Sequence, residues 1–152
     1  MRSSKLPLLV SLYLLNAGIG TVVAVARKLP YLFGGPGDPA TVAIDFPTKG
    51  TALSPPLTVM FLLAALTLLV LRKDRWGMVG VAAVCILAVP LTIGGVMEPI
   101  VWEPMLVALS LLGIGLPPLM IIFGVPEFIE RWRAKRPAPM GRSEVTTTAW
   151  PK

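Results

Sequence analysis

The sequence predicts an all-α integral membrane protein, with four transmembrane helices forming a bundle and a short amphipathic interfacial helix on the C-terminal side. Of its 152 residues, 55% are hydrophobic and only 14% are charged, whereas a soluble domain carries about 25% charged residues. Mean hydropathy is +0.76. The apolar residues gather in long runs, and the charged residues lie between these runs. A helix needs about 20 such residues to cross a hydrocarbon layer of ~30 Å.

We expect a single membrane domain over residues 1–136, followed by a disordered cytoplasmic tail over 137–152 that is rich in Pro, Ser and Thr. Within the domain the four spans cover about 6–26, 55–71, 76–96 and 104–124. A loop over 27–54 separates the first two spans, and the interfacial helix covers 126–136.

The first span follows Arg2 and Lys5. It ends in an Ala-Val-Ala sequence at 24–26, which also fits a signal-peptide cleavage site. Its apolar run is longer than a signal peptide requires and has Asn16 at its centre, so we expect an uncleaved span. Asn16, Gly20 and Ala24 share one helix face, and small residues at this spacing let another backbone approach closely.

The loop 27–54 contains many Gly and Pro residues, which exclude a long helix. Residues 41–46 have strand character, and we expect a short strand or hairpin over the helix ends. After the loop, Ser54 suits an N-cap and Pro55 suits the first helical position of the second span.

The second and third spans are joined by the basic turn 72–75, which is short enough to make them antiparallel neighbours. Both later spans contain residues that weaken a helix. We expect kinks or helix breaks at these positions, because proline removes a helical hydrogen bond and glycine loosens the backbone: Pro90, Gly94, Gly95, Pro117 and Pro118.

Pro126 suits the start of a further helix over 126–136. Phe128, Ile129 and Trp132 share one face of that helix, and Glu127 can pair with Arg131 at i,i+4. An apolar face opposite a basic face is typical of a helix that lies in the lipid headgroup region.

The distribution of basic residues predicts the orientation. Three of the 14 Lys and Arg residues lie in the loop 27–54, namely Arg27, Lys28 and Lys49, and the remaining 11 fall on the other side of the predicted spans. The positive-inside rule then places both termini in the cytoplasm. Composition favours a bacterial gene, so we expect the bacterial inner (plasma) membrane.

The residue inventory excludes several kinds of chemistry. The chain has no His and a single Cys, so the commonest metal ligand and an intrachain disulfide are both lacking. We predict no catalytic residues, cofactor or metal, and no nucleic-acid partner, because the basic residues flank the spans. Asn16 is the chain's one asparagine; near mid-membrane it is either a helix–helix hydrogen-bonding residue or a ligand contact.

Four carboxylates are weaker candidates for a site: Asp38, Asp45, Glu98 and Glu103. All four lie on the predicted outer side, where oxygen ligands suit a hard cation such as calcium. Their spacing matches no calcium-binding loop, and the alternative is that they are solvated interface residues.

Three functions stay open on these grounds. The first is a non-enzymatic membrane protein that associates with itself as a homo-oligomer or with a larger membrane complex. The second is a small oligomeric transporter or channel that uses the expected helix breaks. The third is a membrane-embedded enzyme.

Overall fold

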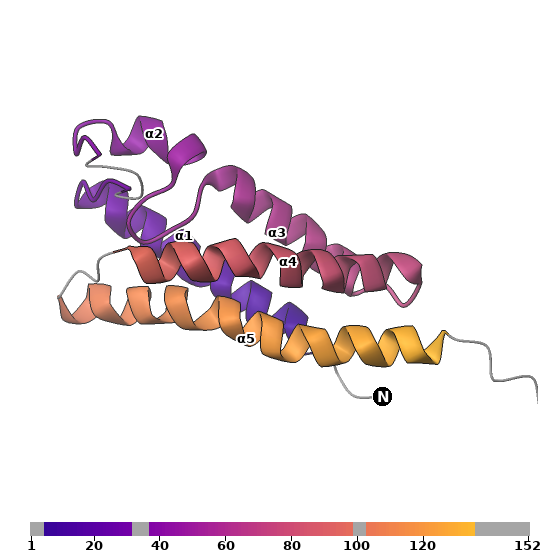
Figure 1. Ribbon diagram of the computed structural model, residues 1–152. Helices are drawn as coiled ribbons and strands as arrows, with labels where there is room; N and C mark the ends of the chain where they lie inside the picture. The colour runs from indigo at the N-terminus through magenta and orange to yellow at the C-terminus, as the bar shows by residue number, and fades with distance from the viewer. Residues whose placement is uncertain (1–4, 32–36, 99–102, 136–152) are drawn as a thin grey trace, which may run out of the picture.

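The computed structural model describes residues 5–31, 37–98 and 103–135. The part of the chain that it describes is all-helical and contains five α-helices (Figure 1). Their bounds are Leu6–Ala26 for α1, Val42–Lys49 for α2, Leu57–Val70 for α3, Arg75–Met97 for α4 and Pro104–Ala134 for α5.

The four larger helices pack in a closed ring. α3 contacts α1 and α4, and α5 contacts α4 and α1, so α1 lies diagonally opposite α4. α2 rests on α1 and α3 at one end of the molecule, which we call the α2 end. The opposite end, which we call the turn end, carries the start of α1, the α3–α4 turn and the end of α5 (Figure 1).

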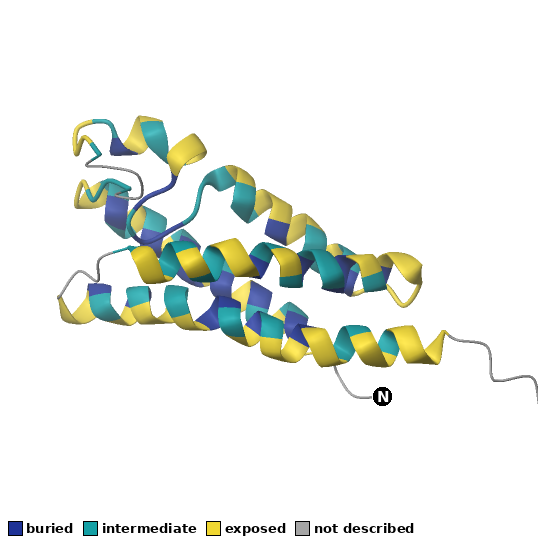
Figure 2. Cartoon of the chain, in the orientation of Figure 1, coloured by how far each residue is buried: buried dark blue, intermediate teal, exposed yellow. Residues whose placement is uncertain are grey.

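Three helices are long and apolar enough to cross a membrane: α1, α4 and α5. α3 is apolar but has only 14 residues, or about 21 Å of helix at ~1.5 Å per residue. Large apolar side chains are exposed on the outward faces, including Leu8, Leu68 and Ile86 at about 70% exposure (Figure 2). Outward apolar faces of this extent are those of a membrane protein.

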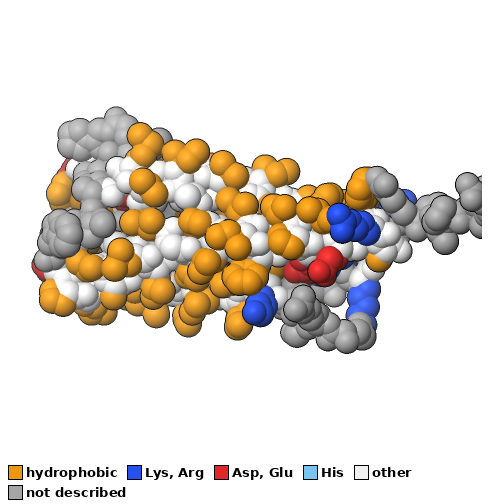
Figure 3. Space-filling model, turned by 60° about the horizontal axis from the view of Figure 1, so that its bottom comes forward, with side chains coloured by type: hydrophobic (Ala, Val, Ile, Leu, Met, Phe, Trp, Pro, Cys, Tyr) orange, Lys and Arg blue, Asp and Glu red, His pale blue; other side chains and the backbone are white. Residues whose placement is uncertain are grey.

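The core consists of two clusters. The larger runs through the middle of the molecule and includes Leu6, Leu63, Val84 and Met120. The smaller lies towards the α2 end and joins Ala24 of α1 to Leu106 and Leu109 of α5 through Leu53. In Figure 3, hydrophobic side chains are spread along the visible face of the helices, while the basic side chains gather towards one end.

Neither α4 nor α5 is interrupted at the positions where kinks or helix breaks were expected. α4 continues through Pro90 and the glycine pair that follows it, and α5 continues through Pro117 and Pro118. Each proline removes one backbone donor. Because α5 is packed between α1 and α4, neighbouring helices hold its backbone in place after that loss.

The prediction of a separate helix at 126–136 is also wrong. Pro126 lies inside α5, which runs unbroken to Ala134. Phe128 packs against the larger core cluster rather than sharing an outward face with Ile129 and Trp132, both of which are exposed. Packing of Phe128 therefore keeps these turns aligned with the rest of α5.

The strand expected at 41–46 is a helix instead, because local polar contacts favour helical spacing. The Asp38 carboxylate accepts from the Ala40 backbone N–H at 2.8 Å. The Thr41 hydroxyl donates to Asp45 at 2.7 Å, and Lys49 pairs with Asp45 at 3.2 Å. Both pairs are four residues apart and so lie on one helix face.

The start of the second span also differs from the prediction. α3 begins at Leu57 with Pro56 as its N-cap residue. Ser54 does not cap α3, because its hydroxyl is engaged by Thr21 at 2.9 Å and by Thr51 at 2.7 Å.

Candidate functional site

Residues 50–56, which we call the wedge segment, enter the helix ring at the α2 end. The segment folds back on itself: the Thr51 N–H donates to the Ser54 carbonyl at 2.9 Å, and the Ser54 N–H donates to the Thr51 carbonyl at 3.2 Å. Thr51, Leu53 and Ser54 are all buried. Gly50 begins the segment at φ +80°, a backbone conformation that suits glycine.

Gly20 of α1 allows this close packing. A Cβ at Gly20 would lie 2.6 Å from the Leu53 carbonyl oxygen, so a larger residue would displace the wedge segment. The face formed by Asn16, Gly20 and Ala24 is buried, as the small-residue pattern predicted. The backbone that approaches α1 at Gly20 is that of the wedge segment.

Beneath the wedge segment lies an open pocket of about 150 Å³ between α1 and α4. α5 closes one side of it, and Val59 of α3 and Tyr31 contribute to the rim. The lining is largely apolar, with a few polar groups. The residues used below are Tyr13, Asn16, Tyr31, Glu98, Ser110 and Gly113.

Asn16 is the most unusual residue of the lining. Its side chain is 4% exposed, and its Nδ2 donates to the Leu109 carbonyl of α5 at 3.1 Å. This is the helix–helix hydrogen bond expected for a mid-membrane polar residue. Its Oδ1 is buried and has no hydrogen-bond partner among the described residues. An unsatisfied buried acceptor of this kind costs about 1–3 kcal/mol.

Glycine leaves space beside this amide. A Cβ on Gly113 would lie 3.6 Å from the Asn16 Nδ2, and one on Gly95 would lie 3.4 Å from Ile114 Cγ1. Gly95, Gly113 and Asn16 therefore meet at one level of the pocket. Glu98 follows Gly95 by three residues and caps the end of α4. At a rise of ~1.5 Å per residue it lies about 4.5 Å from Gly95 along the helix axis.

Glu98 places a negative charge in the lining, near the hydroxyl of Tyr31. Glu98 is the C-cap residue of α4, and its N–H donates to the Gly94 carbonyl at 3.1 Å. Partial burial raises the pKa of the Tyr31 hydroxyl, and the negative charge of Glu98 raises it further. Both groups line the pocket.

The other candidate carboxylates do not join Glu98. Glu103 forms an ion pair with Arg27 that ties the start of α5 to the end of α1. Asp38 and Asp45 serve the local contacts of α2. Within residues 5–31, 37–98 and 103–135, no three acidic, Cys or His side chains form a group that could hold a metal ion.

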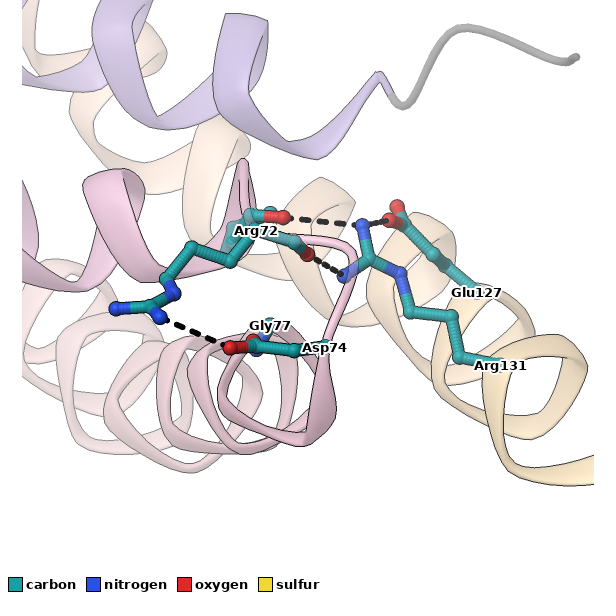
Figure 4. Close-up of polar contacts among 6 residues, drawn as sticks. Arg72, Asp74, Gly77, Glu127 and Arg131 are labelled. Atoms are coloured by element: carbon teal, nitrogen blue, oxygen red, sulfur yellow. Dashed lines mark hydrogen bonds and ion pairs between the residues drawn. The ribbon is translucent and has the colours of Figure 1, made fainter. Parts of the chain in front are cut away.

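At the turn end, Arg131 of α5 connects three groups (Figure 4). Its guanidinium donates to the carbonyls of Val70 at 3.0 Å and Arg72 at 3.2 Å, and it pairs with Glu127 at 2.5 Å. The expected Glu127–Arg131 pair is thus present. Its link to the carbonyls of Val70, the last residue of α3, and of Arg72, just beyond it, was not expected from the sequence.

Asp74 organises the same turn. It accepts from the N–H groups of Trp76 and Gly77 at 3.0 and 3.2 Å, which caps α4. It also pairs with Arg72 at 2.9 Å (Figure 4). The side chains at the turn end bind backbone groups at the helix ends and form ion pairs with one another. They hold α3, α4 and α5 together and do not line the pocket.

Sequence reasoning identified Asn16 and Glu98 but missed the wedge segment and most of the pocket lining, including Tyr13, Ser110 and Gly113. Gly20 followed by Thr21 was the available signal, since Gly20 admits the wedge segment and Thr21 bonds to it. Comparison of this chain with protein-family models, with curated proteins and with solved structures finds no match.

Proposed function

We propose that the chain is a four-span protein of the bacterial plasma membrane, with both termini in the cytoplasm, and that its pocket binds a small ligand from the outer side. In this arrangement α3, although shorter, is also a span, the second along the chain. It occupies a place in the helix ring equivalent to that of the three longer helices, and the wedge segment continues its path at the α2 end.

The distribution of charge supports this orientation. The basic turn 72–75 and the basic end of α5 share the turn end, whereas Glu98 and Glu103 lie at the opposite end of the helix ring. The positive-inside rule assigns the turn end to the cytoplasm. The last turns of α5 then lie at the inner membrane interface, as a continuation of the fourth span.

One observation carries the binding role: Asn16 has a buried, unpartnered acceptor, and the same side chain lines an open pocket. Buried acceptors in proteins are normally satisfied by protein, water or ligand. The remaining walls offer apolar contact and a few polar groups at one rim, which is the usual composition of a small-molecule site. These walls support binding rather than catalysis.

Asn16 also provides the test. It is the single asparagine of the chain, so selective ¹³C,¹⁵N-asparagine labelling yields one side-chain amide signal and one Cγ signal. The full chain in phosphatidylcholine nanodiscs is titrated with four single-ring probes: toluene, benzyl alcohol, benzylammonium and benzoate. We expect at least one probe to shift the Asn16 side-chain signals in a saturable manner.

Two glycines of α5 supply a matched pair of variants. Gly113 lines the pocket, whereas a Cβ on Gly115 meets nothing within 4 Å. Gly113→Leu should abolish the shift, and Gly115→Leu should preserve it. Circular dichroism is used to check that both variants fold. If Gly113→Leu does not fold, Gly113→Ala takes its place. A binding role is refuted if no probe shifts Asn16, or if filling the pocket leaves the shift unchanged.

A second role, association with a second copy or with a larger membrane complex, has its own supporting observation. A Cβ at Gly18 of α1 or at Gly115 of α5 would meet open space, so the backbone is accessible there to another helix. Native mass spectrometry after extraction in lipid particles should show a homo-oligomer or a stable partner. A lone monomer would refute this role. The transporter alternative relies on kinks or breaks at the prolines of the later spans; α4 and α5 are continuous there, so no helix break supports it.

A further inference from the structure

Two polar groups of the pocket, the Asn16 Oδ1 and the Glu98 carboxylate, favour a hydrogen-bond donor, whereas the lining hydroxyls can donate or accept. The deep Asn16 Oδ1 can only accept, because the Nδ2 of the same amide already donates to Leu109. At the rim, Glu98 is the one charged side chain among the described residues that line the pocket. A carboxylate also accepts only, and it attracts positive charge.

We propose that the ligand is a small organic cation: a protonated primary amine with an apolar body. This inference rests on the binding role proposed above and names the chemical class of the ligand. An ammonium group carries three donors and no acceptor, so it matches the acceptors of this pocket in both charge and hydrogen bonding. Tyr13 and Tyr31 also line the pocket, and aromatic rings provide favourable contacts for a cation.

The size of the pocket limits the apolar body. Its volume of about 150 Å³ is close to that of an engineered apolar cavity that holds one benzene molecule. A single ring with a one-carbon amine arm is therefore of suitable size. Because the Asn16 oxygen is itself covered, a donor reaches it only after a small rotation of the amide, for which Gly113 leaves space.

Other ligand classes match these groups less well. An anion would meet Glu98 at the rim and find no cationic side chain among the lining residues that the structure describes. A neutral alcohol would satisfy Asn16 but gain little from the carboxylate. Water satisfies Asn16 without using the apolar walls, and in that case no added probe would change the Asn16 signals.

The four probes of the asparagine experiment separate these classes. We expect benzylammonium to bind most tightly and to move the Asn16 Cγ signal in the direction of a newly accepted hydrogen bond. Benzyl alcohol should bind more weakly, and benzoate should not bind. Toluene should leave the Cγ signal unmoved, since it has no donor.

Two carboxylates at the α2 end, one in the pocket lining and one outside it, provide the matched variants. Glu98→Gln removes the charge that lines the pocket, whereas Glu103→Gln removes the same charge from a residue that pairs with Arg27 outside it. Loss of a hydrogen bond to a charged group corresponds to about tenfold in affinity. We therefore expect benzylammonium to bind about tenfold more weakly to Glu98→Gln, with little change for Glu103→Gln.

The outcomes distinguish this inference from the broader proposal. Equal binding of all four probes, each shifting Asn16, would overturn the cation preference and leave the binding role intact. Unchanged benzylammonium affinity in Glu98→Gln would do the same. If none of the probes moves the Asn16 signals, both proposals fail together, because the pocket then holds water alone.

Discussion

Replacing Arg131 with alanine should loosen the turn end more than any other single loss of charge on α5. The guanidinium is only 25% exposed and Glu127 16%, so water screens their contact incompletely. The bond to the Val70 carbonyl is partly buried, whereas the bond to the Arg72 carbonyl is exposed and open to replacement by water. Weighting the buried bond at about 1.5 kcal/mol and the other two contacts at about 1 kcal/mol or less gives about 3 kcal/mol of lost unfolding free energy.

Arg133 is the matched control, because it lies two residues away on the same helix and is exposed. Both variants remove one positive charge near the proposed inner interface. Unfolding free energy is measured by titrating mixed micelles with dodecyl sulfate and following helicity by circular dichroism. Arg131→Lys should recover less than half of the loss, because a compact ammonium lacks the planar fork that spans two carbonyls and a carboxylate. Equal losses for Arg131→Ala and Arg133→Ala, within about 0.5 kcal/mol, would refute this account of the turn end.

Three further predictions concern packing and topology. Gly124→Ala should cost about 1–3 kcal/mol, because its Cβ would overlap Cys85 Sγ, and adding Cys85→Ala should restore most of the loss; a double variant no better than the single one would contradict this contact. Gly20→Ala should destabilise the fold by a similar amount by displacing Leu53, whereas Gly18→Ala, which meets open space, should be neutral or slightly stabilising; the same unfolding titration compares them. A reporter active only in the cytoplasm should function when fused at residue 152 or in the turn 72–75 and should be silent at Lys49, and activity at Lys49 would reverse the proposed topology.

The helices that depend on long apolar runs could be predicted from the sequence. The first was predicted at 6–26 and is Leu6–Ala26, and the third was predicted at 76–96 and is Arg75–Met97. The end of the last helix was misplaced by ten residues, because Pro126 was interpreted as a helix start. Proline favours a helix start when its surroundings are unknown, but Phe128 and Arg131 hold this part of α5 against its neighbours.

The site was less predictable, because its parts come from distant positions. Asn16 was identified, and its hydrogen bond to Leu109 joins residues 93 positions apart. The Asn16 Oδ1 is unpartnered because no described residue of the fold places a hydrogen-bond donor beside it. No local sequence pattern could indicate the absence of such a donor. Similarly, Ser54 had a plausible role as an N-cap, and only the contact with Thr21 across 33 positions shows why it serves the wedge segment instead.

The two ends of the molecule differ in how their helices are held, and this difference determines where a ligand can enter. At the turn end, Asp74 caps α4, Arg131 binds the end of α3, and Lys5 lies 5.3 Å from the Phe123 ring. At the α2 end, α3 diverges from α4, and the wedge segment occupies the space through backbone and hydroxyl contacts (Figure 1). The Arg27–Glu103 ion pair also holds α1 to α5 at this end, but α3 is connected there through a short irregular segment, and local opening favours such segments over packed helices. The wedge segment is part of the pocket lining, so we expect its movement to widen the entrance for a ligand from the proposed outer side.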